Sequence, residues 1–227
     1  MPYAPDSYPR QIPEFKITGK GTITVSGNGI ITGDSTIPND GADFGPDTML
    51  GATGPGQYGP PYTTSNGMAE AITYANYAGI FQIIRGIHVS SALTFPALNS
   101  TFGSYVVRGA GLTPVFNPIG STLSGQNFIV VQNNPNTQSE YTFLDFGIQD
   151  ITTTGVNSMI NQSGGILWLS RFYFYGAGKS KYLVYIAGGE SHIDSGLFDL
   201  WTTAAIYVDT PGGGPFWFTN LHRHSGL

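Results

Sequence analysis

Two aspartates and one arginine in the C-terminal half have residue types and a spacing that suit acid–base chemistry. Asp145 and Asp194 each follow an apolar residue in a short strand-like segment, and Arg171 ends a similar segment between them. If these segments stack as coils about 4.8 Å apart, the aspartates lie two coils and about 9.6 Å apart. Inverting glycosidases hold their carboxyl groups about 6.5 to 9.5 Å apart, so Asp145, Asp194 and Arg171 are candidate catalytic residues. Asp150 and Asp199 occupy turn-like positions and could simply tie down turns.

An aromatic residue precedes the apolar centre of each of these segments. The four residues are Phe143, Trp168, His192 and Trp217. Because side chains alternate across a strand, we predict that they point outward and form an external file. An exposed apolar patch usually marks an interface, so cover by the N-terminal arm or a neighbouring subunit is favoured. A platform for sugar rings is the alternative, and an error in the assumed register is a third explanation.

The apolar centres themselves recur at intervals of 25, 24 and 25 residues. They are Leu144, Leu169, Ile193 and Phe218. A fixed period of this size, with two or three short strand-like runs in each repeat, is typical of a parallel β-helix solenoid. Glycine clusters separate the runs, and the Leu/Asn signature of leucine-rich repeats is missing from the sequence.

Residues 1–62 are predicted to form an N-terminal arm. Alternating apolar residues from Phe15 to Ile31, with Asn28-Gly29 between them, predict a β-hairpin, and a Pro/Gly-rich linker follows. Residues 66–78 are apolar on one side, begin after Thr64 or Ser65 and stop at Gly79, which predicts a helix over the end of the core. Residues 63–227 are then one capped β-helix domain.

Short motifs lead from the predicted helix into the first strands. They are Met68-Ala69-Glu70-Ala71-Ile72, Arg85-Gly86-Ile87-His88-Val89, Leu93-Thr94-Phe95 and Val106-Val107-Arg108-Gly109-Ala110-Gly111. In this order they resemble the opening of the pectate-lyase-like superfamily, including phage tailspikes. Upstream, Gly41-Ala42 with Asp47-Thr48 is also similar. The fold class we predict is therefore all-β, a single-stranded right-handed parallel β-helix with an N-terminal capping α-helix and a β-hairpin arm.

The resemblance does not supply catalytic residues. Lyases of that superfamily hold calcium with several carboxylates and use an Arg or Lys as base, whereas only Arg171 lies near Asp145 and Asp194 here. The Asn-Thr-Asp, Asp-Asp, Gly-His-Gly and Arg-Ile-Lys motifs of polygalacturonases do not occur in the sequence. We predict no metal ion and no cofactor.

Composition narrows the range of partners. Charged residues make up 10% of the chain, the net charge is −5, and no Lys/Arg cluster occurs, so nucleic acid is not an expected partner. The chain has no cysteine and no apolar run long enough to span a membrane. Met1 to Arg10 lack the basic and apolar regions of a signal peptide, which fits a processed or cloned end or a virion component.

These observations predict a structural or adhesive surface β-helix that self-associates into a homo-oligomer or filament. We expect it at a virion surface, as a tailspike or fibre, or in an extracellular filament, with a polysaccharide as a further partner. The alternative is a polysaccharide lyase or glycoside hydrolase, but the sequence favours a protein without enzymatic activity. A third interpretation is a piece of a longer β-helix protein, which the abrupt C-terminus suggests and which is compatible with either function.

Overall fold

The computed structural model describes residues 22–26, 42–75, 79–96, 102–109, 114–132, 138–209 and 214–224. In these ranges the chain is all-β apart from one short helix, and it winds into a β-solenoid of about 5 turns. Paired strands in the described ranges run parallel, so the solenoid predicted from the repeat is confirmed.

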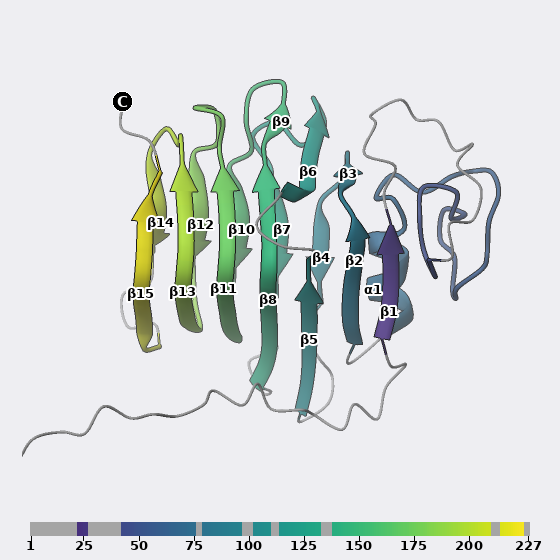
Figure 1. Ribbon diagram of the computed structural model, residues 1–227, viewed down its shortest axis with the longest axis horizontal. Coiled ribbons are helices and arrows are strands. Elements are labelled where there is room, and N and C mark those ends of the chain that lie inside the picture. The colour runs from purple at the N-terminus through teal and green to yellow at the C-terminus, as the bar shows by residue number, and fades with distance from the viewer. Residues whose placement is uncertain are drawn as a thin grey trace, which may run out of the picture.

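Successive coils add strands side by side to a large sheet (Figure 1). Along its main path the strands are β1 (Thr22–Ser26), β2 (Gly79–Arg85), β5 (Phe102–Arg108), β8 (Gln138–Gln149), β11 (Ile166–Tyr175), β13 (Glu190–Asp199) and β15 (Phe216–Arg223). Three further strands join this sheet off the main path, namely β3 (Ile87–Val89), β6 (Pro114–Gly120) and β9 (Ile151–Thr152).

The second sheet lies behind the first in Figure 1. Its strands, in spatial order, are β4 (Leu93–Phe95), β7 (Asn127–Val131), β10 (Ser158–Gln162), β12 (Tyr182–Ile186) and β14 (Ala204–Val208). Apolar side chains from both sheets fill the space between them. Each coil can bury these side chains only against its neighbours, which is why the repeat is visible in the sequence.

The inner column of the large sheet supplies much of this core. It contains Val107, Phe143, Leu169, Ile193 and Phe218, which are paired in register from β5 to β15. The first four are buried, and full burial of such a side chain contributes about 1.5 to 3 kcal/mol to folding.

The predicted register was wrong at its first step. Leu169 pairs with Phe143 and not with Leu144, so the interval between these two coils is one residue longer than the sequence indicated. Phe143 is 1% exposed, and it therefore points into the core instead of outward. The sequence was ambiguous because two adjacent apolar residues can each occupy an inward position.

A backbone kink recurs at one position in four coils. This kink column contains Asp145, Arg171, Ser195 and Asn220, whose φ angles lie between 52° and 56°. Residues other than glycine rarely adopt this left-handed conformation, although Asp and Asn tolerate it better than most. The kink bends β8, β11, β13 and β15 at aligned positions of the sheet, so each of these strands consists of two straight segments.

The single helix, α1 (Met68–Ala75), is shorter than predicted. It begins later because Asn66 and Gly67 have φ angles of 50° and 80°, which a helix excludes. Gly67, and not the predicted Thr64 or Ser65, is the N-cap residue, because its carbonyl accepts the first intrahelical hydrogen bond, from the Ala71 amide. The Ser65 hydroxyl still accepts a hydrogen bond from the Ala69 amide of the first turn at 3.0 Å. Its buried side packs against β1, β2 and β4, and residues 76–78 of the predicted helix lie outside the described residues.

The start of the large sheet involves part of the predicted arm. β1 pairs in parallel with β2, and Val25 also forms a bridge with Phe44. Both Val25 and Phe44 are buried. The rest of the predicted hairpin, residues 15–21 and 27–31, lies outside the described residues.

Candidate functional site

Three aromatic rings stack along the outer face of the large sheet. Trp168, His192 and Trp217 occupy consecutive positions of the outer column, which continues to Thr142 and not to Phe143. The Trp168 and His192 ring centroids lie 3.7 Å apart with an interplanar angle of 11°, and those of His192 and Trp217 lie 4.2 Å apart at 13°. Three of the four predicted members of the external file are therefore brought together.

This stacking decides which ring surfaces are open to a ligand. Both faces of His192 are covered by the two tryptophans, and one face of Trp168 is covered by His192. Trp217 is 47% exposed and ends the stack. A sugar ring that stacks on this file would therefore use the outer face of Trp217, because this is the exposed end of the stack, whereas the other end, at Trp168, adjoins Thr142.

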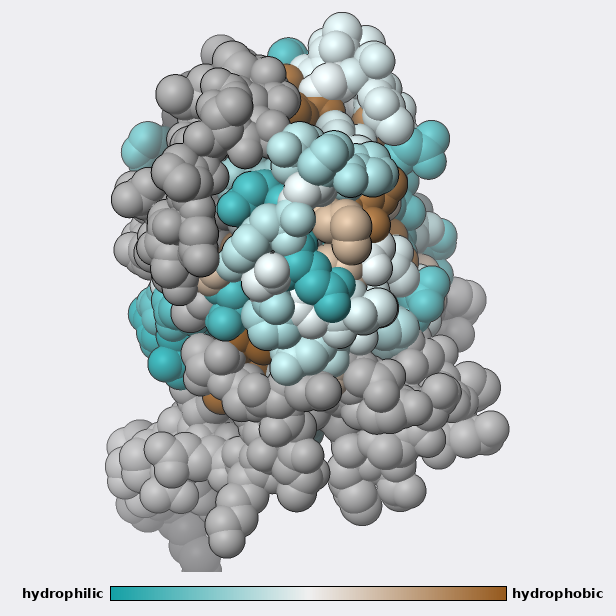
Figure 2. Space-filling model, turned by 90° about the vertical axis from the view of Figure 1, so that its right-hand side faces the viewer, coloured by the Kyte–Doolittle hydropathy of each residue, from teal (hydrophilic) through white to brown (hydrophobic). Residues whose placement is uncertain are grey.

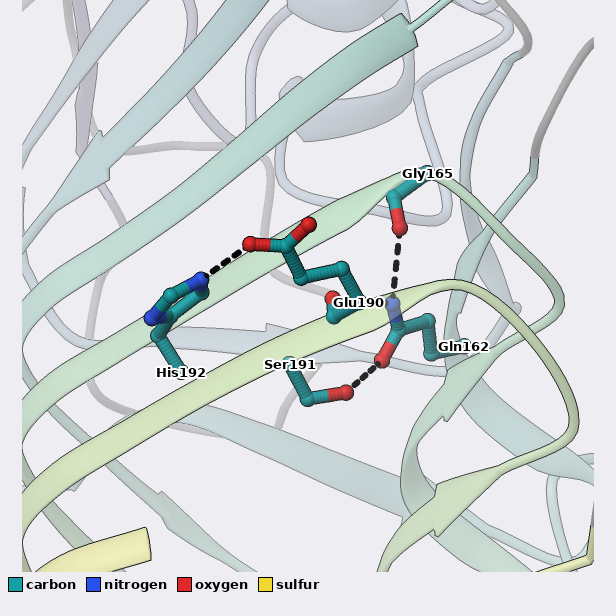
Figure 3. Close-up of polar contacts among 5 residues, drawn as sticks. All are labelled: Gln162, Gly165, Glu190, Ser191 and His192. Atoms are coloured by element: carbon teal, nitrogen blue, oxygen red, sulfur yellow. Dashed lines mark hydrogen bonds and ion pairs between the residues drawn. The ribbon is translucent and has the colours of Figure 1, made fainter. Parts of the chain in front are cut away.

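Glu190 holds the imidazole of His192 within the stack. Its Oε1 lies 2.5 Å from His192 Nε2 (Figure 3). Both side chains are partly exposed. They occupy positions i and i+2 of β13, so both point outward on the same strand. This pair places a carboxylate and an imidazole beside the aromatic edges.

The buried side-chain amide of Gln162 holds the backbone at Glu190, next to His192, in place. Gln162 Nε2 donates hydrogen bonds to the carbonyl oxygens of Gly165 at 3.1 Å and Glu190 at 2.8 Å. Its Oε1 accepts a hydrogen bond from Ser191 Oγ at 2.5 Å (Figure 3). Gln162 and Ser191 are buried, so they tie the start of β13 to the preceding coil.

A second carboxylate lies in the same column as Glu190. Ile166 pairs with Glu140 on one side and with Glu190 on the other, which puts the two glutamates two coils, or about 9.6 Å of backbone, apart. Burial, followed by the charge of Glu190, raises the pKa of Glu140 above its ordinary value, while His192 acts in the opposite direction. Glu140 can therefore stay protonated to a higher pH than an exposed glutamate.

Neither glutamate was among the residues predicted from the sequence. The signal that could have found them is their position, two residues before Thr142 and His192, which gives them the same outward direction. Recognising that Glu140 and Glu190 share a column requires the correct register, which the sequence left ambiguous at Phe143.

The two predicted aspartates lie in neighbouring columns and not in one column. Asp145 lies in the kink column, where Arg171 donates hydrogen bonds from Nε to Oδ1 at 2.5 Å and from Nη2 to Oδ2 at 2.7 Å. These hydrogen bonds lower the pKa of Asp145. Asp145 is thus a paired, ionised surface carboxylate, and Arg171 is its partner.

Asp194 belongs to the neighbouring column, with Leu144, Ser170 and Thr219. The sequence-based register had placed Asp145 and Asp194 in one column, and the one-residue shift at β8 separates them. Asp194 Oδ1 accepts hydrogen bonds from Thr219 Oγ1 at 2.5 Å and Asn220 Nδ2 at 2.9 Å. It therefore connects β13 to β15.

Asp150 and Asp199 hold turns together. The buried Asp150 carboxylate accepts hydrogen bonds from the Val156 amide at 2.8 Å and the Ser180 hydroxyl at 2.6 Å, as well as from Thr152. Asp199 accepts a hydrogen bond from Tyr173 at 3.3 Å and contacts His224 Nδ1 at 3.2 Å. These contacts give both aspartates a structural explanation.

A tyrosine cluster occupies the second sheet near the C-terminal coils. The rings of Tyr182 and Tyr207 stack at 4.9 Å, and those of Tyr185 and Tyr207 stack at 5.6 Å. The Tyr185 hydroxyl donates a hydrogen bond to Asp209, which raises the pKa of Tyr185 to about 12. Stacking between β12 and β14 thus joins the last two coils on this side also.

The last coil leaves core-type side chains open. Phe218 of the inner column is 41% exposed, and Val208, which continues the buried column of Val131 and Ile186, is 37% exposed. Phe216 and Leu221 on β15 are partly buried and pack against the core. The C-terminal end of the described solenoid is therefore an apolar surface.

Some kinds of site are not seen in the described ranges. No group of three or more His, Asp or Glu residues there is placed to hold a metal ion. None of the helical segments in the same ranges has the length and apolar character needed to cross a membrane. Comparison of the chain with models of protein families, with curated proteins and with solved structures finds no match.

Proposed function

We propose that this chain is a structural or adhesive β-helix protein that associates with further copies of itself. In this proposal it is a right-handed, pectate-lyase-like β-helix whose N-terminal end is capped by α1 and which carries a hairpin arm. It would serve at a virion surface or in an extracellular filament, with a polysaccharide as a further partner. The observation that carries the proposal is the apolar end at β14 and β15.

The physical argument is the cost of leaving that end in water. Phe218 and Val208 stand in columns whose other described members are buried, so each has the direction of a core residue, and no coil among the described residues covers it. Covering one such side chain contributes on the order of 1 kcal/mol or more. The last strands of both sheets also have an outer edge, and such edges favour pairing with another chain.

Light scattering over a concentration series, with negative-stain images of the same samples, tests self-association. We expect discrete oligomers or filaments whose mass rises with concentration. Because the contact is apolar, assembly should persist or strengthen when sulfate salts are added. A protein that remains monomeric at the highest concentrations would refute the proposal.

An enzyme that acts on polysaccharide is the second candidate, and Glu140 and Glu190 favour it. In an inverting hydrolysis Glu140, with its raised pKa, would protonate the glycosidic oxygen, and Glu190 would accept a proton from the attacking water. Their column separation is close to the upper limit for such a pair, and Trp168 and His192 lie beside them.

A panel of neutral and acidic polysaccharides tests this candidate. Turnover that falls at least about 100-fold in both Glu140→Gln and Glu190→Gln would support it. Asp145→Asn is the matched control, because that carboxylate is ionised and paired with Arg171, and it should leave turnover unchanged. No turnover on any member of the panel would exclude the enzymatic candidate for those substrates.

A further inference from the structure

The two ends of the solenoid differ in chemistry. At the end formed by β1 and α1, Val25, Phe44 and Met68 are all buried, and Phe44 bridges the first strand. Figure 2 looks onto this side, and its described surface is mostly teal to white, with brown confined to smaller patches. At the other end, Phe218 and Val208 are exposed. The described N-terminal end therefore offers no apolar counterpart to β15.

The direction of side chains along β15 is symmetric about its kink. Phe218 and Leu221 pair with the inward positions of Ile193 and Gly196, and they flank Thr219 and Asn220 on either side. One residue further out, Trp217 and His222 pair with the outward positions of His192 and Leu197. Read in either direction from the kink, the strand gives the same order of inward and outward side chains.

Such a strand is complementary to an antiparallel copy of itself. In that pairing Phe218 faces Leu221 of the second copy, so an inward residue meets an inward residue. Trp217 faces His222 of the second copy, which repeats the Trp–His contact that Trp168 and His192 already make at 3.7 Å. Antiparallel strands form hydrogen-bonded ladders with directly opposed residues, so no crossover connection is needed.

Charge does not oppose this pairing. Arg223 is the one Arg or Lys residue of β15, and its guanidinium lies over the Trp201 ring at 5.2 Å. β15 contains no Asp or Glu. Two copies of this edge therefore approach without a dense array of like charges.

The geometry points to a second copy of this chain as the occupant of the C-terminal end, joined through antiparallel β15 strands about a twofold axis. The inference rests on the proposed self-association and names its surface and symmetry. Because the same patch is used on both copies, the contact is isologous and closes at a dimer. A head-to-tail filament would need an apolar surface beside β1, where the described residues are covered.

Engineered cysteines test the register directly, because the chain has no cysteine of its own. The double variant Trp217→Cys/His222→Cys should form a covalent dimer under mild oxidation, since each new thiol faces its counterpart on the second copy. Within one chain the two positions are separated by roughly 17 Å of strand, too far for a disulfide. Each single variant is a matched control and should stay mostly uncrosslinked.

Disruption of the surface provides an independent measurement. Phe218→Asp should raise the dissociation constant of the dimer, measured by light scattering over a concentration series, at least about 100-fold. The far-UV circular dichroism should stay unchanged. Leu50→Asp is the control, because Leu50 is 51% exposed and precedes α1 in the chain, and it should leave the dimer intact.

The outcomes separate this inference from the broader proposal. Oligomers that persist in Phe218→Asp, or a double-cysteine variant that does not crosslink, would overturn the β15 interface while self-association stands. Filaments that grow without limit would overturn the twofold closure. A wild-type protein that is monomeric at every concentration would overturn both, and some other element would then cover β15.

Discussion

Ile193 and Phe218 are neighbours in one column of the solenoid, yet Ile193 is buried and Phe218 is 41% exposed. The two residues have the same direction and similar apolar character, but described coils lie on both sides of Ile193 and on only one side of Phe218. The comparison shows that a solenoid residue acquires its role from its neighbours along the axis. The middle coils and the last coil should therefore respond differently to the same chemical change.

The largest expected difference concerns the inner column. Ile193→Ala should lower the free energy of unfolding by about 2 to 5 kcal/mol, because it leaves a cavity between two coils. Phe218→Ala should cost about 1 kcal/mol or less, because nearly half of that side chain is already in contact with water. Urea unfolding at a concentration where the protein is monomeric measures both values, and equal losses would contradict the comparison.

The next difference concerns two aspartates. Asp150→Ala should cost at least about 2 kcal/mol, because it leaves the Val156 amide and the Ser180 hydroxyl buried without their partner. Asp194→Ala removes contacts to the exposed residues Thr219 and Asn220, which water can replace, so about 1 kcal/mol or less is expected. Thermal unfolding of the two variants ranks them, and a larger loss for Asp194→Ala would reverse our assignment.

On the surface of the middle coils the effect should be small. Asp145→Asn breaks the exposed ion pair with Arg171 and should cost about 0.5 to 1 kcal/mol at low salt and less at high salt. Because folding lowers the pKa of Asp145, its contribution is present above the unfolded-state value and disappears as the pH falls through the lower folded-state value. Stability of the variant and the wild type should therefore converge at acidic pH.

The smallest change in the free energy of unfolding should come from a substitution of Glu140, and this substitution should stabilise the protein where the preceding ones destabilise it. Folding raises the pKa of Glu140, so wild-type stability should decline as the pH rises from the ordinary value of 4.5 through the folded-state value. Glu140→Gln should abolish that decline and gain a few tenths of a kcal/mol at neutral pH, since solvent screens a half-buried group. A loss of stability in this variant at pH 8 would instead assign a structural role to the ionised carboxylate.

Much of the architecture could be predicted because coil stacking imposes a period. The recurrence of apolar residues near Leu169, Ile193 and Phe218 identified the solenoid, and the outward direction of Trp168, His192 and Trp217 followed from strand alternation. The sequence could not choose between Phe143 and Leu144 as the inward residue, because both are apolar and both are buried.

That single ambiguity also determined what was missed at the candidate site. The predicted register, which was wrong by one residue, placed Asp145 and Asp194 in one column. For the same reason it did not place Glu140 and Glu190 in one column, where the structure has them. Sites on a solenoid are built from residues in different coils, so a register error changes which side chains meet. The helix boundary failed for a local reason, the left-handed backbone at Asn66 and Gly67.

The equal registers of β11 and β13 have a consequence for the length of the molecule. Each residue of β11 from Ile166 to Tyr175 that pairs with β13 meets a partner 24 positions later, with no insertion on either side of the kink. A coil of this kind is an interchangeable module, and one more copy of it would lengthen the rod by about 4.8 Å. The length of the solenoid is therefore proportional to the number of such coils.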